Sequence, residues 1–142
     1  MNLEFNRIFK PEIERILPFI EELNDYKISK EVLKKRLEQM LEQHYECWGI
    51  ILEGTYIGVF GLWFLTRHYA GKSCEPDHVY IAPEFRKSGI GQKAFDWIHR
   101  YAIKKECSIA ELNTYVSNFA SHKFYYNKGY EAWGYHMVKR LS

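Results

Sequence analysis

The sequence predicts a mixed α/β fold, with a single domain covering residues 1–142. Three observations carry this prediction. The spacing of apolar residues changes repeatedly between the period of a helix and that of a strand, and glycine and proline separate the resulting segments. In addition, 142 residues is an ordinary length for one domain with its own core. No repeat, linker or low-complexity segment divides the chain.

The N-terminal part predicts a strand and a helix. Residues 3–9 alternate apolar and polar side chains, which favours a strand, and Pro11 suits the first turn of a helix. Apolar residues then recur at helical spacing over residues 13–23, but Pro18 interrupts them. This helix is therefore either kinked at Pro18 or begins near Leu17.

A second helix and a β-hairpin follow. Ser29 is a suitable N-cap for this helix. Residues 48–52 and 56–65 are rich in β-branched and aromatic side chains and flank a short polar turn, which predicts two paired strands. Residues 68–73 are typical of a loop. The apolar face of the second helix is expected to contain Leu33, Leu37, Met40, Leu41 and His44.

The second half of the chain predicts further strands and two more helices. Residues 78–82 form a strand that Pro83 ends, and the helix after it carries Lys104 in its last turn. Gly129 is a left-handed stop for the final helix. The apolar stripe of the first of these helices is Ile90, Ala94, Ile98, Tyr101 and Ala102. The other expected elements are a strand at 109–116, a helix at 118–128 and one or two strands within 130–141.

The composition argues against several classes of protein. A net charge of +2 from 20 basic and 18 acidic residues argues against general binding to nucleic acid or to a membrane surface. Cys47, Cys74 and Cys107 are widely spaced and the six histidines are dispersed, so we expect no disulfide framework and no metal site. No apolar run spans a bilayer and no signal peptide begins the chain, which favours a cytoplasmic protein.

A glycine-containing loop precedes the helix that begins near Ile90. The segment Arg86-Lys87-Ser88-Gly89-Ile90-Gly91 directs backbone N–H groups outward at the positive end of the helix dipole. Two glycines without Cβ atoms let a bulky anion approach, and Arg86 and Lys87 add positive charge. A pyrophosphate fits such a site. The alternative is a tight turn whose cations are merely solvated.

Two other phosphate-binding motifs do not account for this loop. Residues 89–94 match the G-x-G-x-x-A fingerprint of dinucleotide-binding proteins, and Glu111 lies about twenty residues further on. That fingerprint belongs to the first tight turn of a large parallel sheet, and too little chain follows it here. The strand also ends at Pro83, too far from Gly89 for that turn. No G-x-x-x-x-G-K-[ST] string occurs, which excludes a nucleotide P-loop.

Two segments resemble the GCN5-related N-acetyltransferases, the GNAT family. Residues 86–91 match the family's R/Q-x-x-G-x-G/A loop, and residues 79–83 are similar to its central fourth strand and the proline that often follows. Residues 118–130 are similar to N-x-x-A-x-x-x-Y-x-x-x-G-F, with Ser121 in place of alanine and Tyr130 in place of phenylalanine. The resemblance covers the whole chain. It implies a mostly antiparallel mixed sheet, splayed between strands four and five and flanked by about four helices.

The resemblance also implies that acetyl-coenzyme A (acetyl-CoA) is the acyl donor and binds in this splay. Backbone groups of Val79 and Ile81 would pair with the pantetheine arm, and amides at the helix start would hold the pyrophosphate. The resemblance implies that Asn118 helps to orient the cofactor arm, and the alternative role for Asn118 is the N-cap of a helix. The implied cofactor-binding residues are Val79, Ile81, Arg86, Lys87, Ser88, Gly89, Gly91, Gln92, Asn118, Ser121 and Tyr125.

Catalysis would proceed by direct attack of a primary amine on the thioester in a ternary complex. Tyr125 is implied as the general acid, because a phenol with a pKa of ~10 can share a proton with a thiolate. Asp77 is the first candidate for the base: strand alternation places it on one face with Val79 and Ile81. Glu75 is the second candidate, and a chain of water molecules is a further alternative.

The acceptor is not specified by the sequence. We expect a small-molecule amine rather than a protein, and a monomer or homodimer without nucleic acid or membrane partners. A non-catalytic domain that senses acyl-CoA is the alternative function, which the intact Tyr125 disfavours. Aromatic residues that would line an acceptor pocket, or else belong to the core and its rim, are Tyr26, Trp63, His68, Tyr69, Trp133 and Tyr135.

Overall fold

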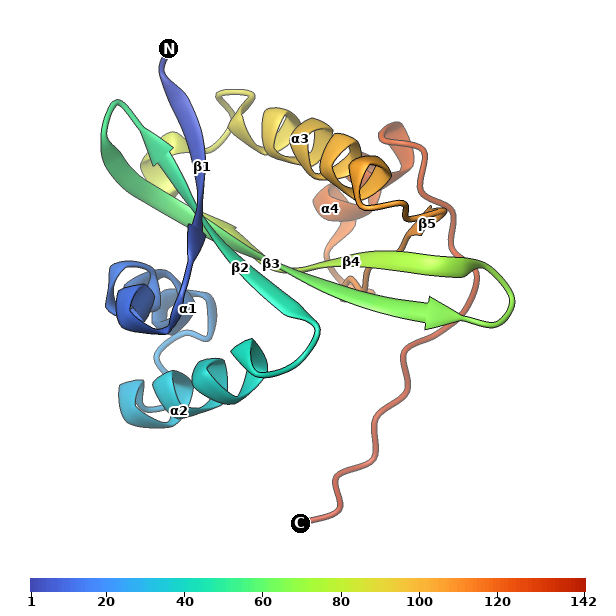
Figure 1. Ribbon diagram of the computed structural model, residues 1–142, viewed down its shortest axis with the longest axis horizontal. Coiled ribbons are helices and arrows are strands. Elements are labelled where there is room, and N and C mark those ends of the chain that lie inside the picture. Colours follow the sequence, from blue (N-terminus) through green and yellow to red (C-terminus); the bar gives the residue numbers. More distant parts are fainter.

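The computed structural model describes residues 1–142 and contains one five-stranded sheet of order β1-β2-β3-β4-β5 (Figure 1). Neighbouring strands from β1 to β4 are antiparallel, whereas β4 and β5 are parallel. This arrangement confirms the predicted mixed α/β fold with its mostly antiparallel sheet. The strands are β1 (Leu3–Ile8), β2 (Tyr45–Leu52), β3 (Thr55–Arg67), β4 (Gly71–Ile81) and β5 (Ile109–Ala110).

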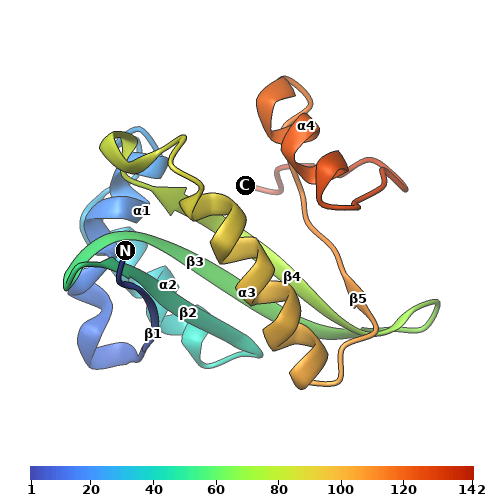
Figure 2. The same ribbon diagram turned by 90° about the horizontal axis from the view of Figure 1, so that it is seen from above.

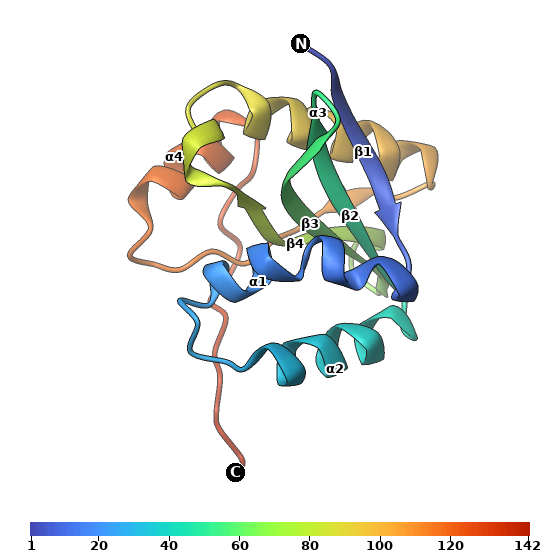
Figure 3. The same cartoon turned by 90° about the vertical axis from the view of Figure 1, so that its left-hand side faces the viewer.

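Helices cover both faces of the sheet (Figures 2 and 3). On one face, α1 (Leu17–Leu23) and α2 (Lys30–Leu41) bury apolar residues against a core cluster that includes Ile8 and Val59. On the other face, α3 (Ile90–Lys104) packs on a second cluster that includes Phe60. The remaining helical elements are η1 (Lys10–Arg15), η2 (Pro83–Phe85) and α4 (Phe119–Asn127).

The N-terminal helix begins near Leu17, one of the two alternatives that the sequence left open. A 3₁₀ helix, η1, ends at Arg15, and α1 then starts with Pro18 in its first turn. Proline is tolerated there because the N–H that it lacks would have no partner inside the helix. The N-cap of α2 is also as predicted, since the Ser29 hydroxyl accepts a hydrogen bond from Val32 N at 3.3 Å.

A β-bulge interrupts β4 and changes which face its side chains occupy. Gly61 pairs with Asp77 and Val59 pairs with Tyr80, so two residues of β4 oppose one residue of β3. His78, within the bulge, has a φ of 37°.

The bulge makes the predicted face of Asp77 wrong. Asp77 lies on the face of Trp63, which packs on the core of α1 and α2, whereas Val79 and Ile81 pack on the α3 side. The extra residue shifts the alternation by one position, which the strand period alone does not reveal.

Strand boundaries in the second half differ from those predicted. β4 begins at Gly71 instead of residue 78, and the strand expected at 109–116 is reduced to Ile109–Ala110. The strands expected within 130–141 are absent, so this prediction is wrong for the structure. A strand needs a neighbour for its backbone groups. The two-residue β5 is the last strand of the sheet, and no further strand pairs with it.

Candidate active site

The loop between β4 and α3 leaves a row of backbone N–H groups without partners. The first amide of α3 that donates within the helix is that of Lys93, which bonds to Gly89 O at 3.1 Å, and the six amides of residues 87–92 donate to no protein acceptor. Gly89 is the N-cap with a φ of 85°, a left-handed conformation that other L-residues adopt only with strain. The loop therefore presents consecutive donors at the positive end of a helix dipole.

Space around the two glycines is not filled by the protein itself. A Cβ added at Gly89 would meet no atom within 4 Å, and one added at Gly91 would meet only Ile81 Cδ1 at 3.8 Å, an ordinary contact. Internal packing therefore does not demand glycine at either position, and at Gly91 the backbone conformation does not demand it either. This pattern is typical of glycines that leave room for a ligand.

Positive charge is concentrated beside these amides. Arg86 is fixed by a hydrogen bond from its Nε to Ile81 O at 2.7 Å, and its guanidinium lies 4.9 Å from the centre of the Tyr80 ring. Lys87 is exposed and forms no ion pair within 4 Å, nor does Arg86. The Ser88 hydroxyl donates to Phe85 O, which helps to shape the loop. The cations thus remain available to an anion.

The splay between the fourth and fifth strands is present. Only Ser73 and Cys74 of β4 pair with β5, through Ile109 and Ala110. Beyond Cys74 no strand pairs with β4 on this side, so its backbone there has no strand partner up to Ile81. The residues predicted to meet the donor, Val79 and Ile81, lie in this unpaired part of the strand.

Tyr125 lies on α4 among aromatic rings. Its ring centre is 5.6 Å from that of Phe95 on α3 and 5.8 Å from that of Tyr130. Burial raises the pKa of the Tyr125 phenol, so the group keeps its proton at neutral pH. The Tyr125 hydroxyl forms no hydrogen bond within the protein, whereas the neighbouring Tyr126 is 61% exposed. Of the two tyrosines, Tyr125 is the one held in place.

The start of α4 shows what Asn118 and Ser121 do within the chain. The Asn118 side chain accepts a hydrogen bond from Ser121 N at 3.3 Å and so caps the helix. Capping is the simpler of the two roles considered for Asn118. Lys128 bonds to Asp96 of α3 at 2.6 Å, which holds the end of α4 against the glycine-loop helix.

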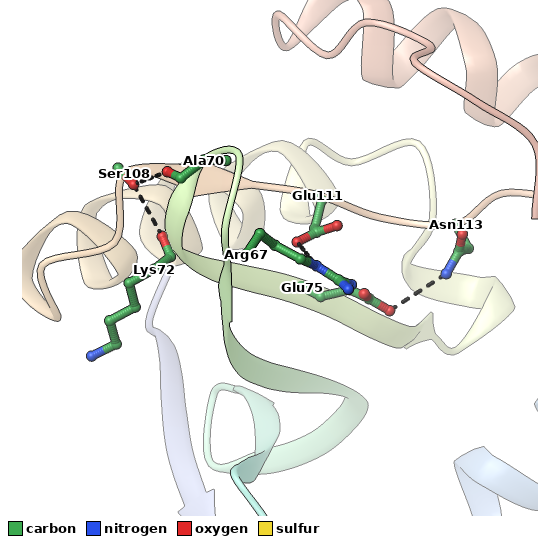
Figure 4. Close-up of polar contacts among 7 residues, drawn as sticks. All are labelled: Arg67, Ala70, Lys72, Glu75, Ser108, Glu111 and Asn113. Atoms are coloured by element: carbon green, nitrogen blue, oxygen red, sulfur yellow. Dashed lines mark hydrogen bonds and ion pairs between the residues drawn. The ribbon is translucent and has the colours of Figure 1, made fainter.

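A group of carboxylates lies where β3, β4 and the chain after β5 meet (Figure 4). Arg67 Nε donates to Glu111 Oε2 at 3.1 Å, and Figure 4 shows Arg67 between Glu111 and Glu75. Asn113 donates to Glu75 at 3.5 Å, a weak contact. Burial, and then the nearby carboxylates of Asp77 and Glu111, raise the pKa of Glu75. The Glu75 carboxyl therefore gains and loses its proton at a higher pH than an ordinary glutamate does.

Asp77 is held more firmly than Glu75. Its Oδ2 accepts a hydrogen bond from Trp63 Nε1 at 2.9 Å, and its Oδ1 accepts one from the His78 backbone N–H at 2.8 Å. The two bonds occupy one lone pair on each oxygen and fix the direction of the carboxylate. Asp77 and Glu75, the two predicted bases, thus lie near one another but in different surroundings.

Sequence reasoning missed Arg67 and did not assign Glu111 to the site. The two residues are 44 positions apart, and only the pairing of β4 with β3 and β5 brings them together. Among the predicted aromatic residues, Trp63 contacts Asp77, and Tyr69 lies 6.4 Å from Trp133 between ring centres. Tyr135 is 90% exposed. The predicted aromatic set does not form one cluster.

No group of three or more histidine, cysteine or acidic side chains is arranged to hold a metal ion. Likewise, none of the helices is both long and apolar enough to cross a bilayer. Two surface hollows, one between β1 and α3 and one beside Tyr45 and Lys105, contain no residue of the glycine loop.

Comparison with known proteins shows which structures and which family this chain resembles. A search against curated proteins finds no significant match. Solved structures of similar fold include AAC(6')-Iy with a CoA bisubstrate analogue, with TM-score 0.83, 16% identity and coverage of 100% of this chain and 99% of that one. Another is ribosomal-protein-alanine N-acetyltransferase from Brucella melitensis biovar Abortus 2308, with TM-score 0.82, 18% identity and coverage of 99% and 100%.

A third similar structure is glucosamine-6-phosphate N-acetyltransferase from Arabidopsis thaliana, with TM-score 0.72, 17% identity and complete coverage of both chains. At these identities the structures establish the fold. The sequence itself matches the model of the acetyltransferase (GNAT) family over residues 11–130. This match includes the glycine loop, the splayed strands and Tyr125, and the chain therefore belongs to the GNAT family as an N-acetyltransferase that depends on acetyl-CoA.

Proposed function

We propose that this acetyltransferase acts on the primary amine of a small, positively charged acceptor, with Glu75 as general base and Tyr125 as general acid. The observation that carries the donor half is the run of six unpartnered amides from residue 87 to residue 92. The acceptor half is supported by three neighbouring carboxylates, Glu75, Asp77 and Glu111, of which Glu111 forms an ion pair with Arg67.

The amides of residues 87–92 would hold the pyrophosphate of acetyl-CoA, with Arg86 and Lys87 adding long-range attraction. The donor fits this part of the chain because the glycines leave space and the amides need acceptors. Backbone groups near Val79 and Ile81 would bond to the pantetheine arm as an added strand does. When bound, acetyl-CoA supplies an activated thioester. Ser121 and Asn118 would border the arm at the start of α4.

Glu75 would accept a proton from the incoming ammonium group, since an amine attacks only when it is neutral. A carboxylate whose pKa is raised by burial and by like charges is a stronger base at neutral pH than an ordinary one. Asp77, which is fixed by Trp63 and the backbone, would attract and orient the cation. This assignment reverses the order in which the sequence ranks the two carboxylates.

Tyr125 would then donate its phenolic proton to the departing thiolate. The raised pKa of the phenol keeps it protonated until a basic group forms beside it. Its ring is held by Phe95 and Tyr130, which fixes the direction of the hydroxyl, and that hydroxyl has no competing partner in the protein. A fixed donor of this kind contributes about 10²–10⁴-fold to a proton-transfer step.

Calorimetric titration of CoA into the protein and two glycine variants tests the donor site. Gly89 and Gly54 both have φ near 80° (85° and 79°) and open space where a Cβ would lie, so valine at either position carries a similar backbone strain. We expect Gly89→Val to weaken CoA binding at least tenfold and the matched control Gly54→Val to leave it unchanged. Equal affinities for both variants would place the pyrophosphate elsewhere.

A screen of amine acceptors tests the proposed acceptor site. We expect CoA release with polycationic small amines, such as aminosugars or polyamines, to exceed the release with neutral or anionic amines. A preference for anionic or uncharged acceptors that Glu75→Gln does not alter would overturn the role of the carboxylates. Because donor binding is measured separately, failure of this screen leaves the donor site unaffected.

A further inference from the structure

A hollow at the far end of α3 has no role in the proposed reaction. It has a volume of about 640 Å³ and lies where the starts of β2 and β4 and the end of β3 meet Lys105, the residue that follows α3. The helix runs about 20 Å along the sheet from the glycine loop to this end, at about 1.5 Å per residue (Figure 2). None of the residues from 86 to 92 and none of the carboxylates Glu75, Asp77 and Glu111 lines the hollow. It is therefore distinct from the proposed donor and acceptor sites.

The side chains that line the hollow carry an excess of positive charge. Arg7, Lys72 and Lys105 contribute three cations, and Glu46 is the one acidic residue of the lining. With His44 left out of the count, positive charges exceed negative ones by two, which equals the net charge of the whole chain. A hollow lined mainly by one sign of charge concentrates the electric field and attracts ions of the opposite sign.

Glu46 does not neutralise these cations. It is a buried residue, and its Oε1 accepts hydrogen bonds from Trp48 Nε1 at 3.1 Å and from the Tyr101 hydroxyl at 2.7 Å. The nearest nitrogens of Arg7 and Lys105 lie 3.6 Å and 3.9 Å from its oxygens, which is longer than a hydrogen bond. One carboxylate that is already engaged by two neutral donors therefore leaves most of the positive charge uncompensated.

The Arg7 guanidinium is held in place without using its hydrogen-bond donors. Its centre lies 5.1 Å from the centre of the Phe9 ring and 6.0 Å from that of the Trp48 ring. Its Nε is buried and has no hydrogen-bond partner, and the side chain as a whole is 33% exposed. Because a guanidinium presents five N–H donors in a planar fork, its exposed edge is suited to a carboxylate or a phosphate.

The two lysines are fixed in a similar way. Lys72 Nζ donates one hydrogen bond to Lys105 O at 2.8 Å and lies 5.8 Å from the centre of the Phe64 ring. Lys105 Nζ lies 5.4 Å from the centre of the Tyr101 ring. An ammonium group has three donors, so Lys72 keeps two of them free and Lys105 keeps all three. The hollow thus combines positioned cations with donors that lack acceptors.

We propose that this hollow binds a small organic anion through a head group that carries two negative charges on oxygen, as a phosphate monoester or a dicarboxylate does. Two charges on the ligand match the two uncompensated charges of the lining. The volume falls within the range of about 300–1,000 Å³ that is usual for small-molecule sites, so there is room for more than the head group. Phe64 and Leu65 offer apolar surface for the rest of such a ligand, and Thr66 offers a hydroxyl.

The first test follows backbone amide signals by NMR while inorganic phosphate or succinate is added at constant ionic strength. We expect the signals of residues 64–66, 72 and 105 to shift and to saturate, whereas glycerol or additional chloride should not produce this response. Phosphate can also reach the glycine loop, so residues 87–92 are followed in the same titration, and Gly89→Val should abolish only their shifts. A response confined to residues 87–92, or one that rises without saturation for both anions, would overturn the proposal.

A second test removes the lysines of the hollow. Lys72→Gln combined with Lys105→Gln should weaken the binding of phosphate and of succinate at this end of α3 at least tenfold. The matched control, Lys35→Gln combined with Lys139→Gln, removes the same charge from two exposed lysines that form no ion pair, and it should change the affinity less than twofold. Equal losses for the two double variants would reveal only a general attraction of anions to the protein and would refute the site.

A third test uses the carboxylate of the lining. Glu46→Gln keeps an oxygen that can accept the hydrogen bonds from Trp48 and Tyr101, but it removes the negative charge that opposes an anion. Affinity for phosphate and succinate should therefore rise, an effect opposite in direction to that of the lysine variants. An affinity that falls, or that stays the same, would contradict a site that depends on uncompensated positive charge.

Discussion

Gly61 permits the bulge that positions β4, and its replacement is a direct test of that role. A Cβ added at Gly61 would lie 2.3 Å from His78 Nε2 and 2.6 Å from the Tyr45 hydroxyl. Tyr45 is 2% exposed and the His78 ring bonds to its hydroxyl, so neither side chain can move into solvent. Gly61→Ala must therefore push His78, and with it the bulge, away from β3.

The expected cost of Gly61→Ala follows from overpacking. Extra atoms in a filled core typically destabilise by about 1–3 kcal/mol. For a chain of this length, that loss corresponds to a fall in melting temperature of about 3–10 °C. Because Val79 lies in the bulge and Ile81 follows it, CoA affinity should fall as well, whereas Gly134→Ala, where a Cβ meets no atom within 4 Å, should change neither quantity.

Urea unfolding and CoA titration provide the measurements for this prediction. His78→Ala removes the nearest obstructing atom, so in a double-mutant cycle Gly61→Ala should cost less in the His78→Ala background than in the wild type. A loss below about 0.5 kcal/mol, or strict additivity with His78→Ala, would refute the idea that Gly61 makes room for the bulge.

Three further changes test the chemistry of the site. Tyr125→Phe should lower the turnover number about 100-fold or more while leaving CoA affinity within twofold, and an unchanged turnover number would remove Tyr125 from proton transfer. Arg67→Gln removes a cation that lowers the pKa of Glu75, so the acidic limb of the kcat/KM profile should move to higher pH; movement to lower pH would contradict Glu75 as the base. Glu75→Gln should reduce activity but raise the melting temperature at pH 7, because a carboxyl whose pKa is raised by folding loses stability as pH rises through that pKa; the two melting temperatures should converge at pH 4, below the unfolded pKa.

The sequence was sufficient to predict elements that are determined by residues close together in the chain. Ser29 caps α2 and Gly89 begins α3, and each depends on neighbours within one turn. The parallel partner of β4 and the length of β5 were harder to predict from the sequence. Residues 109–116 have the composition of a strand, but pairing stops at Ala110 because the chain then diverges from β4. Residues 130–141 have a strand pattern as well, and the chain itself supplies no partner for them.

The candidate site likewise has one part that the sequence predicted and one part that it did not. The glycine loop was found because its residues are contiguous and its chemistry is set by backbone N–H groups. The surroundings of Glu75 were not foreseeable, since they depend on Arg67 and Glu111 from two other parts of the sheet. The ranking of Asp77 above Glu75 depended on regular strand alternation, which the bulge at His78 breaks.

Under the proposed function, the bulge would let one strand serve both substrates. Val79 and Ile81 belong to the α3 side of the sheet, next to the amides of residues 87–92, whereas Asp77 lies on the side of Trp63. An unbroken strand would place residues 77, 79 and 81 on one face, and donor and acceptor would compete for it. With the extra residue, the side chains of Val79 and Ile81 lie on one face of β4 and that of Asp77 lies on the other. We therefore expect donor and acceptor to meet along β4 beyond Cys74, where β5 no longer covers the edge of the strand.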